Sequence, residues 1–82
     1  MAARAVTVVV ERAPGGGSGW SLRVGGAERF LFGCAFTALG WVRQHLERLG
    51  ATEAERGRVL GLVIRELERK RCATVTAEVS HG

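Results

Sequence analysis

The chain has 82 residues, a length that fits a single domain spanning 1–82. Hydrophobic residues make up 46% of it, which is more apolar side chain than two layers of this size can hide, so we expect a homodimer. The alternative is a monomer with an unusually apolar surface. The longest run without charge, 30–42, is shorter than the roughly 20 residues that span a bilayer, which excludes a membrane-spanning helix.

The net charge of +4 and the pI of about 10.5 permit anionic partners such as nucleic acid. Eleven of the twelve basic residues are arginine, and Asp, Asn and Tyr are absent. A GC-rich coding bias produces the same pattern without any selection for phosphate contacts. The positive charge alone therefore does not identify a function.

The first part of the chain has the alternation that is typical of a β-strand. Residues 5–12 place Val6, Val8 and Val10 on one face, as expected for a strand with one buried side. The segment 13–19 (APGGGSG) is predicted to be a flexible loop, because glycine, serine and proline do not hold regular structure there.

Two further strands are predicted on either side of the Gly-Gly dipeptide at 25–26, which indicates a hairpin turn. A two-residue turn would place Arg23 opposite Glu28. A three-residue turn would instead place Trp20 opposite Phe32 on one face of the sheet. We favour the three-residue turn, because burying aromatic side chains stabilises a sheet more than one exposed charge pair does.

Residues 36–71 are predicted to form two amphipathic helices, because apolar residues recur there at spacings of three and four. Gly50 supplies the stop signal between them, since glycine tolerates the left-handed conformation that ends many helices. Thr52 and Glu55 have the spacing of a capping box, which marks the start of the second helix.

Three glycines interrupt the predicted helices, although an interior glycine costs about 1 kcal/mol relative to alanine. Two of them, Gly57 and Gly61, have the small-residue spacing that lets helices approach closely. We therefore expect either a close helix contact at this pair or, equally, glycines that are merely tolerated.

A fourth strand is predicted over 73–79, followed by a frayed tail at 80–82. The predicted fold is therefore α+β: a small antiparallel sheet with the element order β-β-β-α-α-β, covered on one face by a helical hairpin. The hairpin and the sheet are expected to meet in one core, which comprises Phe36, Leu39, Val42, Leu46, Leu60, Val63, Ile64, Leu67, Trp20, Leu22, Phe30 and Phe32.

The two cysteines, Cys34 and Cys72, lie far apart in the sequence and form no CxxC motif. We expect both to be reduced and buried as small apolar side chains, since free cysteine is among the most buried residue types. No signal peptide precedes the first strand, so a cytoplasmic location is expected.

No motif in the sequence predicts catalysis or metal binding. The histidines are His45 and His81, and the eight acidic residues are all glutamates. His45 and Cys34 would lie about 16 Å apart along one helix, too far to share a metal. We therefore expect no enzymatic activity, no metal and no cofactor, and we expect His45 at an exposed or boundary position.

The surplus of apolar side chains, without catalytic residues, predicts a small non-enzymatic protein–protein interaction module that acts as a homodimer or as an adaptor. Large aromatic side chains dominate the energetics of such interfaces. The candidate interface residues are therefore Trp41, Trp20 and Phe36.

The stretch 28–71, a strand followed by two helices of which the second opens with a capping box, is similar in outline to ribbon-helix-helix DNA-binding dimers. In that family, paired strands enter the major groove and their outward polar side chains read bases. The resemblance implies nucleic-acid binding as the alternative function. The residues that would contact nucleic acid are Arg29 on the strand and, on the second helix, Arg58, Arg65, Arg69, Lys70 and Arg71.

Overall fold

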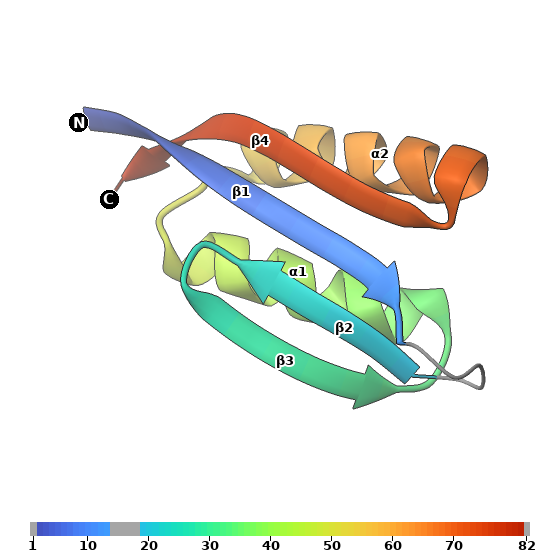
Figure 1. Ribbon diagram of the computed structural model, residues 1–82. Helices are drawn as coiled ribbons and strands as arrows, with labels where there is room; N and C mark the ends of the chain where they lie inside the picture. Colours follow the sequence, from blue (N-terminus) through green and yellow to red (C-terminus); the bar gives the residue numbers. More distant parts are fainter. Residues whose placement is uncertain (1, 14–18, 82) are drawn as a thin grey trace.

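Four strands and two helices make up the structure, a computed structural model that describes residues 2–13 and 19–81. The elements are β1 (Ala2–Arg12), β2 (Gly19–Val24), β3 (Ala27–Phe32), α1 (Ala35–Arg48), α2 (Glu53–Lys70) and β4 (Cys72–His81). The strands form one antiparallel sheet in the order β3-β2-β1-β4, and both helices cover the same face (Figure 1). The predicted α+β architecture and element order are confirmed. The centre of the predicted 13–19 loop lies outside the described residues.

Each helix covers one half of the sheet. α1 packs on β2 and β3, whereas α2 packs on β4 and β1 (Figure 1). The alternation predicted for β1 is confirmed, because its even-numbered valines point toward the helices and are buried. The larger buried side chains between the two layers are Val6, Val8, Val10, Trp20, Leu22, Val24, Val42, Leu46, Val59, Val63, Val75 and Val79.

The turn between β2 and β3 is shorter than predicted. It has two residues, and Arg23 lies opposite Glu28, where the two side chains form an ion pair of 2.6 Å. The first turn residue, Gly25, has a φ of 60°, a value that glycine adopts at little steric cost because it lacks a Cβ atom. The prediction of a three-residue turn is therefore wrong. The tight turn instead sets Ser21 opposite Phe30.

Four residues predicted in the core are exposed. Phe30 and Phe32 share the sheet face that points away from the helices. The tight turn sets this register, because it places Phe30 opposite Ser21 and not opposite the buried Leu22. Phe36 and Ile64 are exposed because the buried faces of α1 and α2 centre on other positions, with Val42 fully buried in α1. The remaining helix residues of the predicted core are buried or pack partly buried against it.

Helix α2 begins with the predicted capping box. Thr52 Oγ1 accepts a hydrogen bond from the Glu55 backbone N–H at 3.2 Å, and Glu55 Oε1 accepts one from the Thr52 N–H at 2.8 Å. The Glu55 carboxylate also accepts hydrogen bonds from the backbone N–H and the hydroxyl of Ser80, so it ties the start of α2 to the end of β4. The prediction of a frayed tail at 80–82 is therefore wrong at Ser80, and β4 continues to His81, whereas residue 82 lies outside the described residues.

The glycine pair in α2 does not mark a close helix contact. A Cβ atom built at Gly57 or Gly61 would meet no described atom within 4 Å beyond the neighbouring backbone of α2. Both residues are exposed, so they lie on the solvent side of the helix. Of the two alternatives that the sequence leaves open for this pair, the described residues agree with tolerated glycines and not with a close helix approach.

The capping hydrogen bonds make stability depend on pH. Hydrogen bonds from Thr52 and then from Ser80 favour the ionised carboxylate and lower the pKa of Glu55 below its ordinary value of 4.5. Because the folded-state pKa is lowered, this stabilisation is present above the unfolded-state pKa and is lost as the pH falls through the folded-state pKa. We expect the urea midpoint of unfolding to be lower at about pH 3 than at about pH 6, and this decrease should be larger for the wild type than for Glu55→Gln.

Glu53→Gln is the matched control for this prediction. Glu53 lies in the same helical turn but makes no hydrogen bond or ion pair with the residues that the structure describes. The Glu53→Gln variant should therefore show the wild-type pH dependence. Equal pH dependence of Glu55→Gln and the wild type would contradict the role assigned to Glu55.

Candidate functional site

All three phenylalanines of the chain are exposed where β3 leads into α1. Phe30, Phe32 and Phe36 are 51%, 75% and 85% exposed. Phe32 is the last residue of β3 and Phe36 is the second residue of α1, so both lie beside the connection between these elements. Phe30 and Phe32 are on the open face of the sheet, and Phe36 is on the helix side. We call these three residues the phenylalanine cluster.

The cluster has a defined geometry on the sheet. The rings of Phe30 and Phe32 meet edge to face, with centroids 5.1 Å apart and an interplanar angle of 81°. Such aromatic pairs contribute about 0.5–1.5 kcal/mol beyond the burial of their surface. The Phe30 ring also lies on Gly19 of β2, where an added Cβ atom would come within 2.7 Å of Cζ. The glycine thus makes room for the ring.

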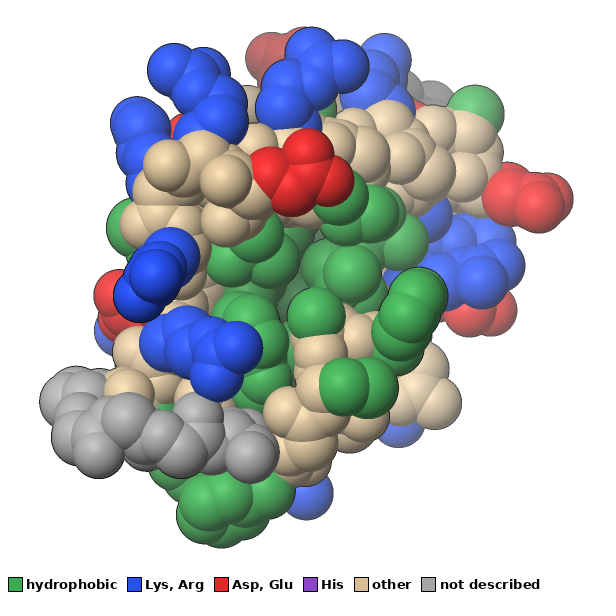
Figure 2. Space-filling model, turned by 90° about the vertical axis from the view of Figure 1, so that its right-hand side faces the viewer, with side chains coloured by type: hydrophobic (Ala, Val, Ile, Leu, Met, Phe, Trp, Pro, Cys, Tyr) green, Lys and Arg blue, Asp and Glu red, His purple; other side chains and the backbone are tan. Residues whose placement is uncertain are grey.

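A shallow groove of about 300 Å³ lies between α1 and α2 beside Phe36. Figure 2 views this end of the molecule and shows a hollow with hydrophobic walls, with basic side chains around it. We call this feature the interhelical groove, and we refer to it together with the phenylalanine cluster as the apolar end. The groove is lined by Ala35, Phe36, Leu39, Ile64, Leu67 and Glu68.

The two tryptophans have different surroundings. Trp20 is in the core, 6% exposed, and its indole Nε1 donates a hydrogen bond to the Gly33 carbonyl oxygen at 3.0 Å. Trp41 is half-buried on α1 and stacks on His45, with ring centroids 3.9 Å apart. His45 thus takes the boundary position that the sequence predicts. Of the three candidate interface residues, Phe36 is exposed, Trp41 is half-buried and Trp20 is buried in the core.

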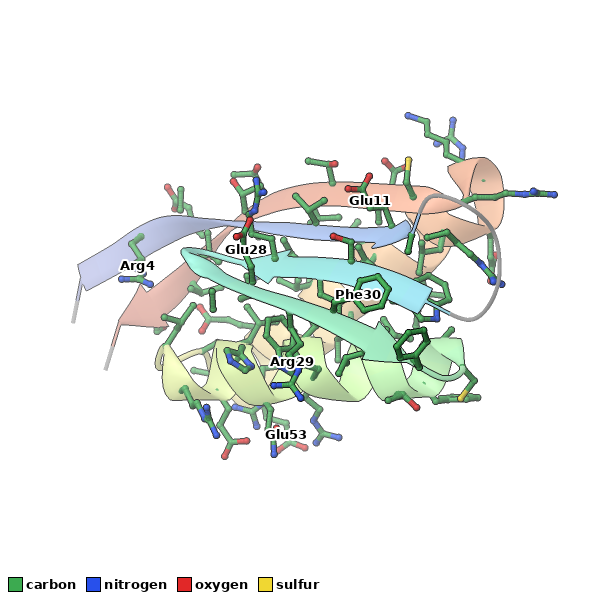
Figure 3. All side chains as sticks on the ribbon, turned by 60° about the horizontal axis from the view of Figure 1, so that its bottom comes forward. Arg4, Glu11, Glu28, Arg29, Phe30 and Glu53 are labelled. Atoms are coloured by element: carbon green, nitrogen blue, oxygen red, sulfur yellow. The ribbon has the colours of Figure 1, made fainter. Side chains whose placement is uncertain are left out.

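A more polar cavity, of about 450 Å³, lies between β3 and α1. Arg29 lies opposite Leu22 in the sheet, so it shares the face that the helices cover. Figure 3 shows the Arg29 side chain reaching toward α1 while Phe30 lies on the other side of β3. Base reading from a strand would require a side chain that points outward from the open sheet face, and Arg29 does not point that way. The cavity is lined by Ala27, Glu28, Arg29, Trp41, Gln44, His45 and Arg48.

Basic side chains align on one side of α2. Arg58, Leu62, Arg65 and Arg69 recur at spacings of four, three and four, so they share one stripe of the helix. We call these four residues the arginine stripe. Its C-terminal part faces β4, because Leu62, Arg65 and Arg69 line a cavity together with residues 74–76.

The other basic candidates lie at two different places. Lys70 and Arg71 follow the arginine stripe at the end of α2, where Lys70 lies 3.9 Å from Glu66. Arg29 lies on β3, and β3 and β4 are the opposite edges of the sheet. The structure thus brings the α2 candidates together but separates them from Arg29.

Both cysteines are free and exposed, so the prediction of buried thiols is wrong. Each lies at the boundary of an element, since Cys34 is the N-cap of α1 and Cys72 is the first residue of β4. A hydrogen bond from the Thr37 backbone N–H, followed by one from its side chain, lowers the pKa of the Cys34 thiol below its usual value.

The described part of the chain offers no obvious metal centre. Within residues 2–13 and 19–81, no three histidine, cysteine or glutamate side chains gather so as to hold a metal ion. Over the same ranges, neither helix combines the length and the apolar character needed to cross a bilayer.

No family model, curated protein or solved structure matches the chain. The fold is that of a small α+β protein, and its most distinctive surface is the apolar end.

Proposed function

We propose that this protein is a small protein–protein interaction module without enzymatic activity, which acts as a homodimer joined through its apolar end. The observation that supports the proposal is the exposure of every phenylalanine of the chain around the connection between β3 and α1. Soluble monomers rarely leave large contiguous apolar patches in water, and such patches mark interaction sites. In an adaptor, a different protein would occupy the same surface.

The apolar end has a shape that suits a symmetric contact. Phe36 projects beside the interhelical groove, so the surface combines a protruding ring with an apolar hollow. In a two-fold interface the same patch is used by both subunits, so each Phe36 can enter the groove of the other copy. Burying a phenylalanine side chain contributes about 1.5–3 kcal/mol. Two such contacts form in one dimer.

Replacing Phe36 with serine is expected to dissociate the dimer. The substitution removes the same contact twice, so the dissociation constant should rise about 100-fold or more. Sedimentation velocity over a range of protein concentrations measures this change. Circular dichroism should show an unchanged fold, because the side chain is 85% exposed.

Leu62→Ser is the matched control, since Leu62 is also exposed but lies on the side of α2 that faces β4. It should leave the dissociation constant within about threefold of the wild-type value. A wild-type protein that stays monomeric at the highest concentrations, or a Leu62→Ser variant that dissociates equally, would contradict the proposed homodimer.

Nucleic-acid binding is the second candidate function, favoured by the alignment of Arg58, Arg65 and Arg69 on one side of α2. We expect binding to a duplex DNA at low salt, with an affinity that falls steeply as salt is added. Fluorescence anisotropy of a labelled duplex measures this dependence. Arg43→Glu changes the charge on α1, away from the arginines of α2, and is the control for an effect of net charge alone. The absence of binding at low salt would remove this candidate.

A further inference from the structure

The two edges of the sheet differ in how well they are protected. β3 is six residues long and carries the adjacent charges Glu28 and Arg29. β4 is ten residues long, and Glu78 is the one Asp, Glu, Lys or Arg residue in it. Proteins usually protect an edge strand with charge, proline or shortness, because its unpaired backbone groups attract another strand. Beyond β4 the described residues supply no further strand.

The backbone groups that β4 presents to this edge can be assigned. The N–H of Ser80 donates to the Glu55 carboxylate on α2 instead of to β1. Because backbone groups alternate between the two sides of a strand, the N–H and C=O groups of Thr74 and Thr76 point the same way, to the free edge. The 3.1 Å contact between the hydroxyls of Thr7 and Thr76 agrees, since side chains approach most closely across pairs that are not hydrogen-bonded.

The C-terminal part of the arginine stripe, from Leu62 to Arg69, forms a wall beside this edge. A cavity of about 330 Å³ lies between α2 and β4, lined by Leu62, Arg65, Glu66, Arg69 and residues 74–76. Arg65 makes no ion pair or hydrogen bond with any residue that the structure describes, and Arg69 reaches Glu66 only at 3.9 Å. Glu66 is also approached by Lys70. The wall is therefore positive on balance, with one apolar side chain, Leu62, within it.

We propose that the free edge of β4 and the arginine stripe together form a docking site for an extended acidic segment of a partner protein, which adds to the sheet as a fifth strand. The exposed N–H and C=O groups of β4 bind an extended backbone. Successive side chains of a strand point to opposite faces, so every second side chain of the segment faces α2. Acidic side chains at these positions would meet Arg65 and Arg69, and an apolar one would meet Leu62.

Other occupants fit this site less well. A second copy of β4 would turn alanines and valines toward the arginine stripe, because Ala73, Val75, Ala77 and Val79 are the residues of β4 on the helix side. A nucleic acid would meet the arginines but would leave the backbone groups of the edge without a strand partner. This inference does not depend on the proposed homodimer, which uses the opposite side of α2.

Fluorescence anisotropy with a labelled peptide tests the proposal. The probe is Thr-Glu-Thr-Glu-Thr-Val-Thr-Glu-Thr, and one control peptide has lysine in place of every glutamate. Two further controls carry backbone N-methyl groups at alternate residues, one in each register. The acidic peptide should bind at least about tenfold more tightly than the lysine peptide, and N-methylation in one register should weaken its binding by about tenfold.

Two variants in the site and two control variants of the protein assign the binding. Arg65→Glu with Arg69→Glu should weaken binding of the acidic peptide at least about tenfold, whereas Arg43→Glu with Arg48→Glu on α1, which changes the net charge equally, should have little effect. Thr74→Pro removes an edge-facing N–H and should also weaken binding. Phe36→Ser should bind the peptide as the wild type does, which separates this proposal from the homodimer. Circular dichroism checks the fold of each variant.

Several outcomes would overturn the proposal. They are no binding of the acidic peptide, equal binding of the lysine peptide, and no effect of N-methylation in either register. A duplex DNA that binds the wild type, loses binding in Arg65→Glu with Arg69→Glu, and binds where the peptide does not would assign the arginine stripe to nucleic acid. A wild-type dimer that Thr74→Pro converts to monomer would show that a second copy occupies the edge.

Discussion

Replacing Trp20 with alanine is expected to lower the free energy of unfolding by about 3–5 kcal/mol. Trp20 is 6% exposed and belongs to the core between the sheet and α1. Its indole N–H also donates to the carbonyl oxygen of Gly33, which connects β3 to α1. The substitution therefore removes a large buried side chain and a link between the sheet and the first helix. Urea unfolding followed by far-ultraviolet circular dichroism measures the loss.

Trp20→Phe separates the two contributions. Phenylalanine keeps most of the buried aromatic surface but cannot donate the hydrogen bond to Gly33. We expect this variant to lose a smaller part of the stability, about 1–2 kcal/mol, since both the hydrogen bond and some packing are lost. A Trp20→Ala variant as stable as Trp20→Phe would contradict the placement of the ring in the core.

Replacing Leu46 with alanine is expected to cost about 2–5 kcal/mol, because this leucine of α1 is fully buried. The loss combines the transfer free energy of the three removed carbon atoms with the cost of the cavity that remains, because the close-packed surroundings relax only partly. The urea midpoint should fall while the dependence of stability on urea concentration stays unchanged.

Leu62→Ala provides the same chemical change at an exposed position. Leu62 is 39% exposed on α2, so its truncation should alter the free energy of unfolding by no more than about 1 kcal/mol. Similar losses for Leu46→Ala and Leu62→Ala would contradict the orientation of the two helices on the sheet.

The sequence could predict the elements because their signals are local. Spacings of three and four identify α1 and α2, and the Thr52–Glu55 capping box forms as its spacing indicates. Gly50 has a φ of 98°, which agrees with its predicted role at the end of the first helix. Alternation identifies β1 and β4, which pair along most of their length. Each of these signals lies within a few residues.

The register of β2 and β3 could not be predicted from local patterns. The preference for stacking aromatic residues on one face treats burial as the deciding term, whereas the turn itself decides the pairing. A two-residue turn at Gly25 and Gly26 shifts β3 by one residue relative to the predicted hairpin. Because side chains alternate, a shift of one residue moves every side chain of β3 to the other face. The Phe30 and Phe32 side chains are exposed for this reason.

The candidate surfaces were predictable only in part. The sequence identifies Phe36 of the apolar end as a candidate interface residue. The groove beside Phe36 depends on the orientation of α1 and α2 on the sheet, which no local sequence pattern encodes. The alignment of Arg58, Arg65 and Arg69 was available from helical spacing, as was Leu62 between them. Their position next to the free edge of β4 depends on the sheet order.

The pairing of Ala2 with His81 has a practical consequence. The first and last strands run side by side, so the two ends of the described chain lie at the same end of the molecule. Figure 1 shows this end far from the start of α1. A tether, a fluorescent protein or a sensor chip attached at either terminus would leave the phenylalanines free. Because the two termini are close together, the domain could also be inserted into a surface loop of a host protein without separating the two ends of that loop.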